Sequence, residues 1–279
     1  MMGDVTLRAG KLRLVLRPSW GGRVVSFDHD VFGDILVPIT DTSFEPEAWP
    51  RGGAYPMLPF HNRVRLGRFD FGRAGHLPVH PDAWPNALHG MANRGCWNAE
   101  SVHVDRARLL WAHEANSAWP WRFSAEQRFE LEPGRLTVAL AIRNEDTYEM
   151  PGGLGWHPYF PTSFTHRTDA STIWPIDGDY LPLGHSEKVV APLRQATAYL
   201  SSWTKVELSH PTMSVMLTAS GLDHLVLHAP GSAYICIEPV SHLAGALNEP
   251  QRRPGAEEGG MTRIQPAQSL QAQIRLEIG

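Results

Sequence analysis

The histidine His157 lies in the segment GLGWHPYFPT, residues 153–162, with aromatic residues on both sides of it. Such a ring could be a structural part of the core, or it could serve as a general acid and base held by its neighbours. Trp156, Tyr159 and Phe160 make its surroundings apolar, which disfavours a protonated imidazolium unless a carboxylate faces it. The segment alone leaves both interpretations open.

A candidate carboxylate occurs in the distant segment YICIEP, residues 234–239. Glu238 follows a run of apolar residues, where a glutamate is rarely buried without a partner. The position therefore favours a paired or functional carboxylate. Together, His157 and Glu238 could remove one proton from a substrate while delivering another. A structural ion pair would look the same in sequence, so spacing does not separate the two interpretations.

The sequence lacks the motifs of several other chemistries. It contains no HExxH, CxxC, GxSxG, GxGxxG or P-loop pattern, which argues against those zinc, hydrolase and nucleotide sites. His76 and His80 have the spacing of two metal ligands on a helix, but Pro78 lies between them and disfavours that helix. We therefore expect no metal and no cofactor.

Composition narrows the possible partners and the cellular location. The net charge is −4, and no stretch carries five like charges in a row, so nucleic acid and membrane surfaces are not expected partners. The first residues do not resemble a signal peptide, and no apolar run is long enough to span a membrane. Cys96 and Cys236 read as two reduced, buried thiols of a cytoplasmic protein.

The hydrophobic pattern has mostly a period of two, which is typical of β-strands. The chain has 25 glycines and 23 prolines, and they interrupt every potential helix. The pattern predicts one all-β sandwich or barrel domain over residues 1–279. The polar segment 44–95 reads as a structured loop region, and residues 249–260 read as an exposed loop. The expected strands are KLRLVLRP (11–18), RLTVALAIRN (135–144), SVMLTAS (214–220), HLVLHAP (224–230), YICIEP (234–239) and AQIRLEI (272–278).

Several segments, in the same order along the chain, resemble the aldose 1-epimerase (galactose mutarotase) family. The resemblance implies a single antiparallel β-supersandwich of the galactose mutarotase type, with few short helices. It also implies interconversion of the α and β anomers of a free sugar, without a cofactor or a metal. The matching segments are NRVRLGRFDF (62–71), LHGMANRGCW (88–97), RNEDTYEMPGGLGWHPYF (143–160), DGDYLPLG (177–184) and CIEPVSHLAGALN (236–248).

The resemblance also implies roles for individual residues. By comparison with the family, His157 would protonate the ring oxygen, Glu238 would take the proton from the C1 hydroxyl, and His89 would assist at the ring oxygen. Arg63, beside Asn62, would bind sugar hydroxyls. The expected working state is an ionised glutamate and a protonated histidine, each favoured by the other's charge.

Aromatic residues are candidates for an apolar wall that faces the sugar. Trp97 and Tyr159 are the expected contributors, whereas Trp156 is expected to pack in the core.

One departure from the family leaves the substrate open. The family usually has a sugar-binding aspartate on a strand about forty residues before the glutamate, and we expect that place near AYLSSWTKVEL, residues 198–208. This chain has Ser201 and Ser202 there, of which Ser202 is the candidate for hydrogen bonding to the sugar. Asp177 and Asp179 read first as turn formers.

Three functions therefore stay open, all in a monomer or homodimer. The first is an aldose 1-epimerase acting on a free sugar. The second is a hexose-6-phosphate 1-epimerase, because Arg65, Arg68 and Arg94 could recognise a phosphate. The third is a carbohydrate-binding protein that lacks catalysis, although binding alone does not require an acid and a base together.

Overall fold

The computed structural model describes residues 3–190, 193, 196–231, 233–248 and 260–279. Within these ranges every pair of strands is antiparallel, and helical structure is limited to five 3₁₀ turns of three residues each. No helix in the described part of the chain has the length and apolar character needed to cross a membrane. The turns are η1 (Pro18–Trp20), η2 (Arg65–Gly67), η3 (Pro81–Ala83), η4 (Ala92–Arg94) and η5 (Ala246–Asn248).

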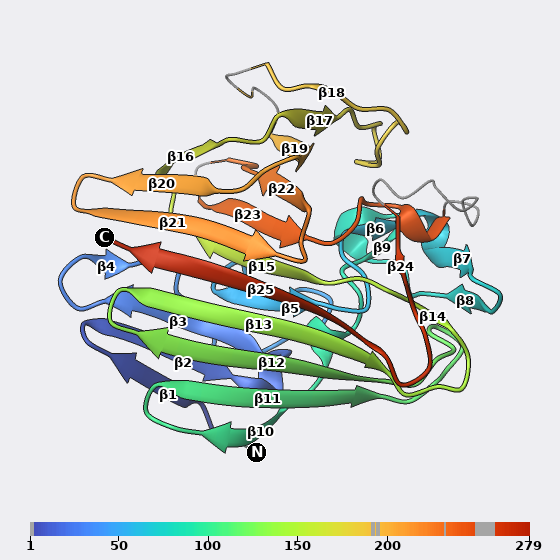
Figure 1. Ribbon diagram of the computed structural model, residues 1–279, viewed down its shortest axis with the longest axis horizontal. Helices are drawn as coiled ribbons and strands as arrows, with labels where there is room; N and C mark the ends of the chain where they lie inside the picture. The colour runs from blue at the N-terminus through green and yellow to red at the C-terminus, as the bar shows by residue number, and fades with distance from the viewer. Residues whose placement is uncertain (1–2, 191–192, 194–195, 232, 249–259) are drawn as a thin grey trace.

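The larger sheet has eleven strands, and His157 and Glu238 lie on two adjacent strands near its middle (Figure 1). Its short strand β4 (Gly33–Asp34) pairs only with β3. The remaining strands are, in spatial order, β1 (Val5–Ala9), β2 (Leu12–Arg17), β3 (Arg23–His29), β5 (Ala54–Met57), β15 (Gly155–Phe160), β23 (Ile235–Val240), β22 (His224–His228), β19 (Thr197–Ser201), β17 (Thr172–Trp174) and β18 (Glu187–Lys188).

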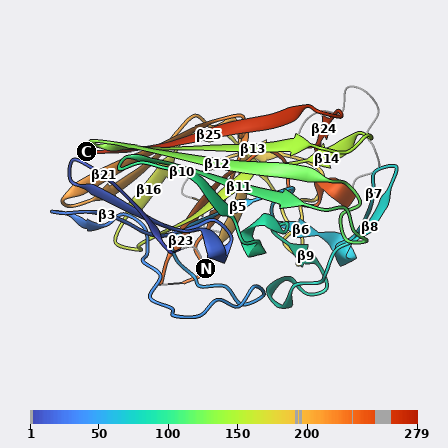
Figure 2. The ribbon, with the colours of Figure 1, turned by 90° about the horizontal axis from the view of Figure 1, so that it is seen from below.

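The second sheet has eight strands and includes the longest ones in the protein. Figure 2 shows it as a layer lying across the larger sheet. In spatial order its strands are β10 (Asn98–Val102), β11 (Arg106–His113), β12 (Phe123–Glu132), β13 (Arg135–Asn144), β25 (Ser269–Ile278), β21 (Met213–Ser220), β20 (Val206–His210) and β16 (Thr165–Thr168).

Three two-stranded ribbons complete the described strands. They are β14 (Met150–Gly152) with β24 (Thr262–Ile264), β6 (Arg63–Val64) with β9 (Ala87–Leu88), and β7 (Arg68–Asp70) with β8 (Ala74–His76).

The core lies between the inner faces of the two sheets. Strand β12 shows the principle, because Phe123, Ala125, Phe129 and other alternate residues are buried, while most of the intervening ones face outward. One continuous hydrophobic cluster includes residues of both sheets, from Leu7 near one end of the chain to Leu276 near the other. The alternating pattern in the sequence thus predicted the sandwich correctly, and the six expected strands are confirmed as β2, β13, β21, β22, β23 and β25.

Two expectations need correction. The segment 44–95 is not only loop, because β5 within it is a fully buried central strand that packs through Tyr55 and Met57. The polar residues around this short strand obscured its apolar character. Cys96 is exposed rather than buried, whereas Cys236 is buried as expected, and both are free thiols. The expected loop 249–260 lies outside the described residues except for its last position.

Candidate active site

Five neighbouring strands of the larger sheet place a row of side chains on one face. The register of β5, β15, β23, β22 and β19 brings Tyr55 opposite His157, and Val226 opposite both Glu238 and Tyr199. Strands β15 and β23 pair Gly155 with Val240 and Tyr159 with Cys236, so His157 and Glu238 lie opposite each other between these pairs. Sheet pairing thus joins residues that are 81 positions apart in sequence.

Apart from Tyr55, this row lines one wall of a cavity of about 250 Å³. Five of the predicted site residues line it, namely Asn62, Arg63, His89, His157 and Glu238. The wall is completed by tyrosines, by a third histidine and by an arginine–aspartate pair. The lining residues are Arg51, Asn62, Arg63, Asp82, Leu88, His89, His157, Tyr159, Tyr180, Thr197, Tyr199, Val226, His228, Tyr234, Cys236 and Glu238.

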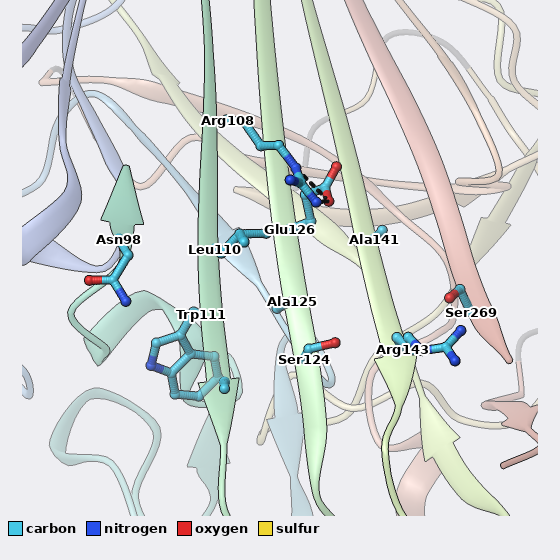
Figure 3. Close-up of a pocket in the computed structure, with 11 residues that line it drawn as sticks. Asn98, Arg108, Leu110, Trp111, Ser124, Ala125, Glu126, Ala141, Arg143 and Ser269 are labelled. Carbon is cyan, nitrogen blue, oxygen red and sulfur yellow. Dashed lines mark hydrogen bonds and ion pairs between the residues drawn. The ribbon is translucent and has the colours of Figure 1, made fainter. Parts of the chain in front are cut away.

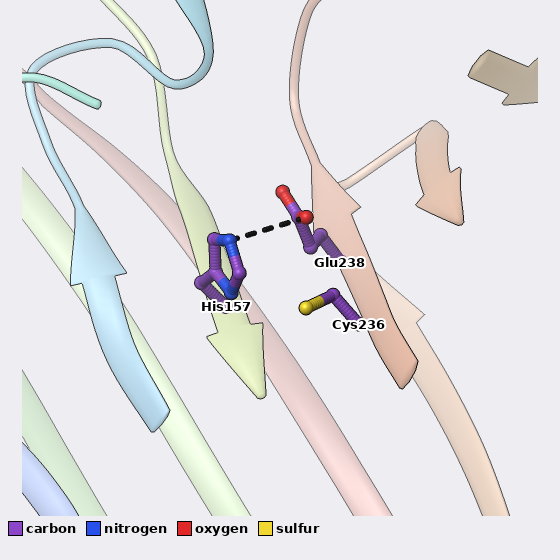
Figure 4. A group of neighbouring side chains, drawn as sticks. All are labelled: His157, Cys236 and Glu238. Carbon is purple, nitrogen blue, oxygen red and sulfur yellow. Dashed lines mark ion pairs between the residues drawn. The ribbon is translucent and has the colours of Figure 1, made fainter. Parts of the chain in front are cut away.

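The predicted acid and base are in contact at the bottom of this cavity. Nε2 of His157 lies 3.2 Å from Oε1 of Glu238, and both side chains are almost completely buried (Figure 4). The other polar atoms of the pair, His157 Nδ1 and Glu238 Oε2, have no hydrogen-bond partner within the protein. The pair is therefore not fully satisfied by the fold, and Glu238 Oε2 is able to accept a hydrogen bond from a bound molecule.

Aromatic rings fix the orientation of the imidazole. His157 packs against both Tyr55 and Tyr159, with ring centroids 4.6 and 4.7 Å away and planes inclined by 24° in both cases. The guanidinium of Arg23 lies on Tyr55, 4.2 Å from the ring centre. A buried ring packed against two aromatic neighbours has little freedom to rotate, so its Nε2 stays directed toward Glu238. Tyr159 is confirmed at the cavity wall, and Trp156 is confirmed as a core residue.

Burial determines the proton state of the pair. Removal from water raises the pKa of Glu238 to about 8, although the charge of Arg63 opposes this shift. Burial lowers the pKa of His157 well below its ordinary value, and nearby His228, Arg23 and other cations lower it further. Desolvation thus opposes the expected imidazolium and carboxylate, because burial shifts both pKa values toward the neutral forms. The raised pKa of Glu238 and the lowered pKa of His157 both favour the neutral forms near neutral pH, so the pair carries one titratable proton.

The backbone of Asn62 is hydrogen-bonded to the imidazole of His89. The Asn62 N–H donates to Nδ1 of His89 over 3.1 Å, so a neutral His89 carries its proton on Nε2. Burial lowers the pKa of His89 well below its ordinary value, which keeps the ring neutral. Its ring lies 5.1 Å from that of His157, perpendicular to it. His89 is therefore a hydrogen-bond donor beside the pair rather than a second acid.

A tight turn presents His89 to the cavity. Both His89 and Gly90 have positive φ, and a side chain at position 90 would collide with the backbone oxygen of Leu58, 2.2 Å from its Cβ. Glycine is thus required at this place. The HG pair, which is uninformative by itself in the sequence, has this physical basis.

Arg63 lies along the cavity wall. Its guanidinium lies 4.7 Å from the centre of the Tyr180 ring, and one of its nitrogens donates to Oδ1 of Asn62 over 3.2 Å. These contacts leave further N–H groups of Arg63 for hydroxyl groups of a ligand.

The prediction for Trp97 is wrong. Its indole is fully buried in the core between the sheets, where it stacks with Trp111 and donates to the carbonyl oxygen of Ala92 over 2.8 Å. It does not line the cavity. The Trp97 side chain follows η4 and is directed inward by that backbone hydrogen bond, which the sequence spacing did not reveal.

The prediction for Ser202 is also wrong. Ser202 is exposed, and its hydroxyl accepts from Thr172 rather than lining the cavity. Ser201 is buried and is engaged by Trp174 and by His224, at 2.8 and 2.6 Å. Strand β19 instead faces the cavity through residues nearer its start.

Sequence reasoning missed the polar residues that β19 and β22 contribute. Thr197 and Tyr199 alternate on β19, and His228 ends β22 directly opposite Thr197. The hydroxyl of Thr197 and Nδ1 of His228 are 2.7 Å apart, which orients the imidazole. Period-two alternation in TAYLS could have identified the first two residues. Attention to the serine pair directed the prediction to the wrong end of the strand.

A larger hollow, of about 380 Å³, lies on the outer side of the eight-stranded sheet (Figure 3). Its charged groups have protein partners, as Arg108 pairs with Glu126 at 2.7 Å and Arg143 pairs with Glu145 at 3.3 Å. None of the predicted site residues lines it. This hollow is larger than the cavity at His157. The cavity is nevertheless the better candidate site, because His157 Nδ1 and Glu238 Oε2 are buried there without a hydrogen-bond partner in the protein.

The family relationship follows from comparison with known proteins. Residues 3–243 match the model of the aldose 1-epimerase family. This chain belongs to the aldose 1-epimerase family. An uncharacterised protein of Escherichia coli K12, YphB, is 26% identical to it over 298 residues, which cover 98% of each chain.

Solved structures agree on the fold of this family member. An E. coli K12 protein assigned provisionally as an aldose 1-epimerase has a TM-score of 0.84 at 22% identity, covering 100% of this chain and 99% of that one. A galactose mutarotase-like protein of Clostridium acetobutylicum has a TM-score of 0.85 at 18% identity, covering 98% and 94%. The galactose mutarotase-like fold expected from the sequence is thus confirmed.

Proposed function

We propose that the protein is an aldose 1-epimerase that interconverts the α and β anomers of a free sugar. The observation that carries the proposal is the contact of His157 with Glu238 at the bottom of a polar cavity. Ring opening requires removal of the proton from the C1 hydroxyl and protonation of the ring oxygen. These two oxygens are bonded to the same carbon, so an acid and a base must lie side by side to reach both.

The pair can perform this exchange with the single proton that it contains. Transfer of that proton from Glu238 to His157 gives carboxylate and imidazolium. The carboxylate then takes the proton of the C1 hydroxyl while the imidazolium protonates the ring oxygen, and the C1–ring oxygen bond breaks. Rotation about C1–C2 exposes the other aldehyde face, and the reverse transfers close the ring. His89 would donate a hydrogen bond at the ring oxygen, and Arg63 with Asn62 would bind hydroxyl groups.

The free sugar is favoured over a sugar phosphate. Arg65 is engaged by Asp177 and Asp179 at 3.0 and 3.4 Å, and Arg94 is engaged by Glu47 at 3.2 Å. These arginines do not line the cavity, and neither does Arg68. The sequence argument for phosphate recognition therefore loses its basis. A protein that only binds carbohydrate would not require the acid and base together.

We further propose a cytoplasmic location, because the two cysteines are free. The small-molecule sugar is the expected partner, and either a monomer or a homodimer is compatible with a cavity lined by one chain.

Polarimetry tests the proposed function. Single anomers of a panel of aldoses and aldose phosphates are dissolved with the purified protein, and relaxation to the equilibrium rotation is followed. We expect acceleration above the buffer rate for at least one free aldose. Binding of a sugar without acceleration would instead support a non-catalytic carbohydrate-binding protein. Acceleration restricted to phosphorylated sugars would support the hexose-6-phosphate epimerase.

The pH dependence of the reaction is expected to show an alkaline decrease. Catalysis requires one proton on the pair, and burial raises the pKa of Glu238 to about 8. Above this pH the pair loses its proton, so kcat/KM should fall; the lowered pKa of His157 places the acid decrease well below pH 6.5. Relaxation rates measured from pH 4 to 10 at low sugar concentration, corrected for the buffer reaction, provide the check. A rate that keeps rising above pH 9 would contradict this proton inventory.

Substitution of Arg63 should weaken binding more than chemistry. Arg63→Gln removes a charged donor at the cavity wall, and hydrogen bonds to charged groups contribute about 1.5–3 kcal/mol each, so kcat/KM should fall about 10- to 100-fold, mainly through KM. Because the charge of Arg63 lowers the pKa of Glu238, the alkaline decrease should also move to higher pH. The matched control is Arg68→Gln, an exposed position outside the cavity. Unchanged KM and an unmoved pH profile in Arg63→Gln would remove Arg63 from the site.

A further inference from the structure

A third potential ligand atom lies beside the acid–base pair. Cys236 precedes Glu238 by two positions on β23, so both side chains lie on the face of the sheet that carries His157. One ligand atom from each of the three residues lies within 4.8 Å of the corresponding atoms of the other two. Figure 4 shows the sulfur of Cys236 and the carboxylate of Glu238 on the side of β23 that faces His157.

These three groups are of the types that bind zinc. Imidazole nitrogen, thiolate sulfur and carboxylate oxygen bind tetrahedral Zn²⁺ at about 2.0–2.3 Å, which places neighbouring ligand atoms roughly 3.2–3.8 Å apart. The 3.2 Å between His157 and Glu238 already meets this requirement. From at most 4.8 Å, the sulfur of Cys236 must approach the other two atoms by no more than about 1.3 Å.

A second observation favours a ligand at this position. Glu238 Oε2 has no hydrogen-bond partner in the protein, and the residue is only 3% exposed, so water does not readily replace that partner. On binding, the thiol and the carboxyl group would lose their protons, and the two resulting negative charges would balance the ion. All three residues also line the cavity, which leaves the fourth position open to water and provides an entry path.

We propose that His157, Cys236 and Glu238 bind Zn²⁺ through Nε2, Sγ and a carboxylate oxygen, and that the bound ion inhibits the protein reversibly. The ion would occupy the lone pairs that the acid and the base use for proton transfer. The inhibition rests on the proposed epimerase function, whereas the binding does not. Zinc here is an inhibitor and not a cofactor, because the anomer exchange requires only the two proton-transfer groups.

Cobalt(II) provides a direct test of binding that does not depend on any activity. Apo-protein is treated with EDTA, desalted and titrated with Co²⁺ under reducing, anaerobic conditions, and the absorption spectrum is recorded. We expect a thiolate-to-cobalt charge-transfer band in the near ultraviolet, with visible bands of tetrahedral cobalt, and loss of both on addition of Zn²⁺. Absence of the charge-transfer band in the wild-type protein overturns the proposal.

Matched variants locate the site. Cys236→Ser should abolish the charge-transfer band, and Glu238→Gln should weaken cobalt binding. Cys96→Ser, which changes the exposed cysteine, should retain the band. Circular dichroism verifies the fold of each variant. A band that persists in Cys236→Ser, or that disappears in Cys96→Ser, would contradict the assignment.

The inhibition is tested separately, with the aldose that gives acceleration in polarimetry. Saturating Zn²⁺ should lower the rate of wild-type protein and Cys96→Ser by more than about tenfold, because both proton-transfer groups are occupied, and EDTA should restore it. Full activity of wild-type protein at a Zn²⁺ concentration that displaces all Co²⁺ would overturn the inhibition. Failure of every sugar in the panel would contradict the epimerase function and leave the cobalt result to decide the metal site.

Discussion

Glu238→Gln is expected to reduce kcat for anomer exchange by about 10²- to 10⁴-fold, the usual contribution of a positioned acid or base. Glutamine has nearly the same shape, so His157 and the neighbouring strands keep their places. The amide can neither remove the proton of the C1 hydroxyl nor hold the shared proton. KM should change much less than kcat, because the lost interaction belongs to proton transfer. Relaxation rates at several sugar concentrations separate the two effects.

The same substitution should stabilise the fold at alkaline pH. In the unfolded chain a glutamate ionises near pH 4.5, whereas burial raises the pKa of Glu238 to about 8 in the folded protein. Between these values the unfolded state releases the proton and the folded state keeps it, so the wild-type protein loses stability as the pH rises. Glu238→Gln lacks this dependence. Its melting temperature should exceed that of the wild type at pH 8, and the difference should shrink toward pH 4.5.

A glutamate on the other sheet provides the control. Glu126→Gln alters a residue that is paired with Arg108 outside the cavity. It should retain wild-type kcat. If Glu238→Gln relaxed anomers as fast as Glu126→Gln, Glu238 would not be the base.

His157→Asn is expected to cause a loss of similar size, about 10²- to 10⁴-fold in kcat. Asparagine cannot deliver a proton to the ring oxygen. The loss should be accompanied by a change of the pH profile, since the remaining carboxyl group would titrate without its imidazole partner. The measurement is kcat from pH 4 to 10, compared with the wild-type protein.

Chemical rescue distinguishes the acid role from a packing role. His157→Ala removes the ring that packs against Tyr55 and Tyr159 and leaves space for an imidazole beside them. Added imidazole should restore part of the activity in this variant and should not do so in Glu238→Gln. The buried His113 of the other sheet offers a packing control, because His113→Asn should alter stability without lowering kcat. Absence of rescue together with normal sugar binding would argue that His157 only supports its neighbours.

The sandwich was predictable because alternation of apolar and polar residues is a local property. KLRLVLRP and RLTVALAIRN show the buried face directly, and both are strands. The short strand β5 was not predictable in the same way. Its apolar run AYPMLPF (54–60) contains two prolines, which disfavour a central strand in sequence, and β15 and β3 pair with it on either side.

The site residues that could be predicted are those whose polar side chains are unusual in an apolar segment. Burial of a glutamate in an apolar strand, or of a histidine among aromatic residues, costs free energy that a hydrogen-bonding partner must offset. The proton state was not predictable, because proximity and burial act in opposite directions and only the buried geometry shows that burial dominates. His228 was missed for a related reason. Its pairing with Thr197 depends on the register of β19 with β22, which no short motif encodes.

Exchange between anomers at equilibrium tests the central claim most directly. Magnetisation-transfer NMR measures how fast the α and β forms of a sugar interconvert, and it is applied to the aldose that polarimetry selects. We expect cross-peaks between the C1 protons of the two anomers with the wild-type protein and with Glu126→Gln. Glu238→Gln and His157→Asn should show none above the buffer rate. Equal exchange in all four proteins, or none in the wild type with any sugar of the panel, would contradict the assignment of proton transfer to His157 and Glu238.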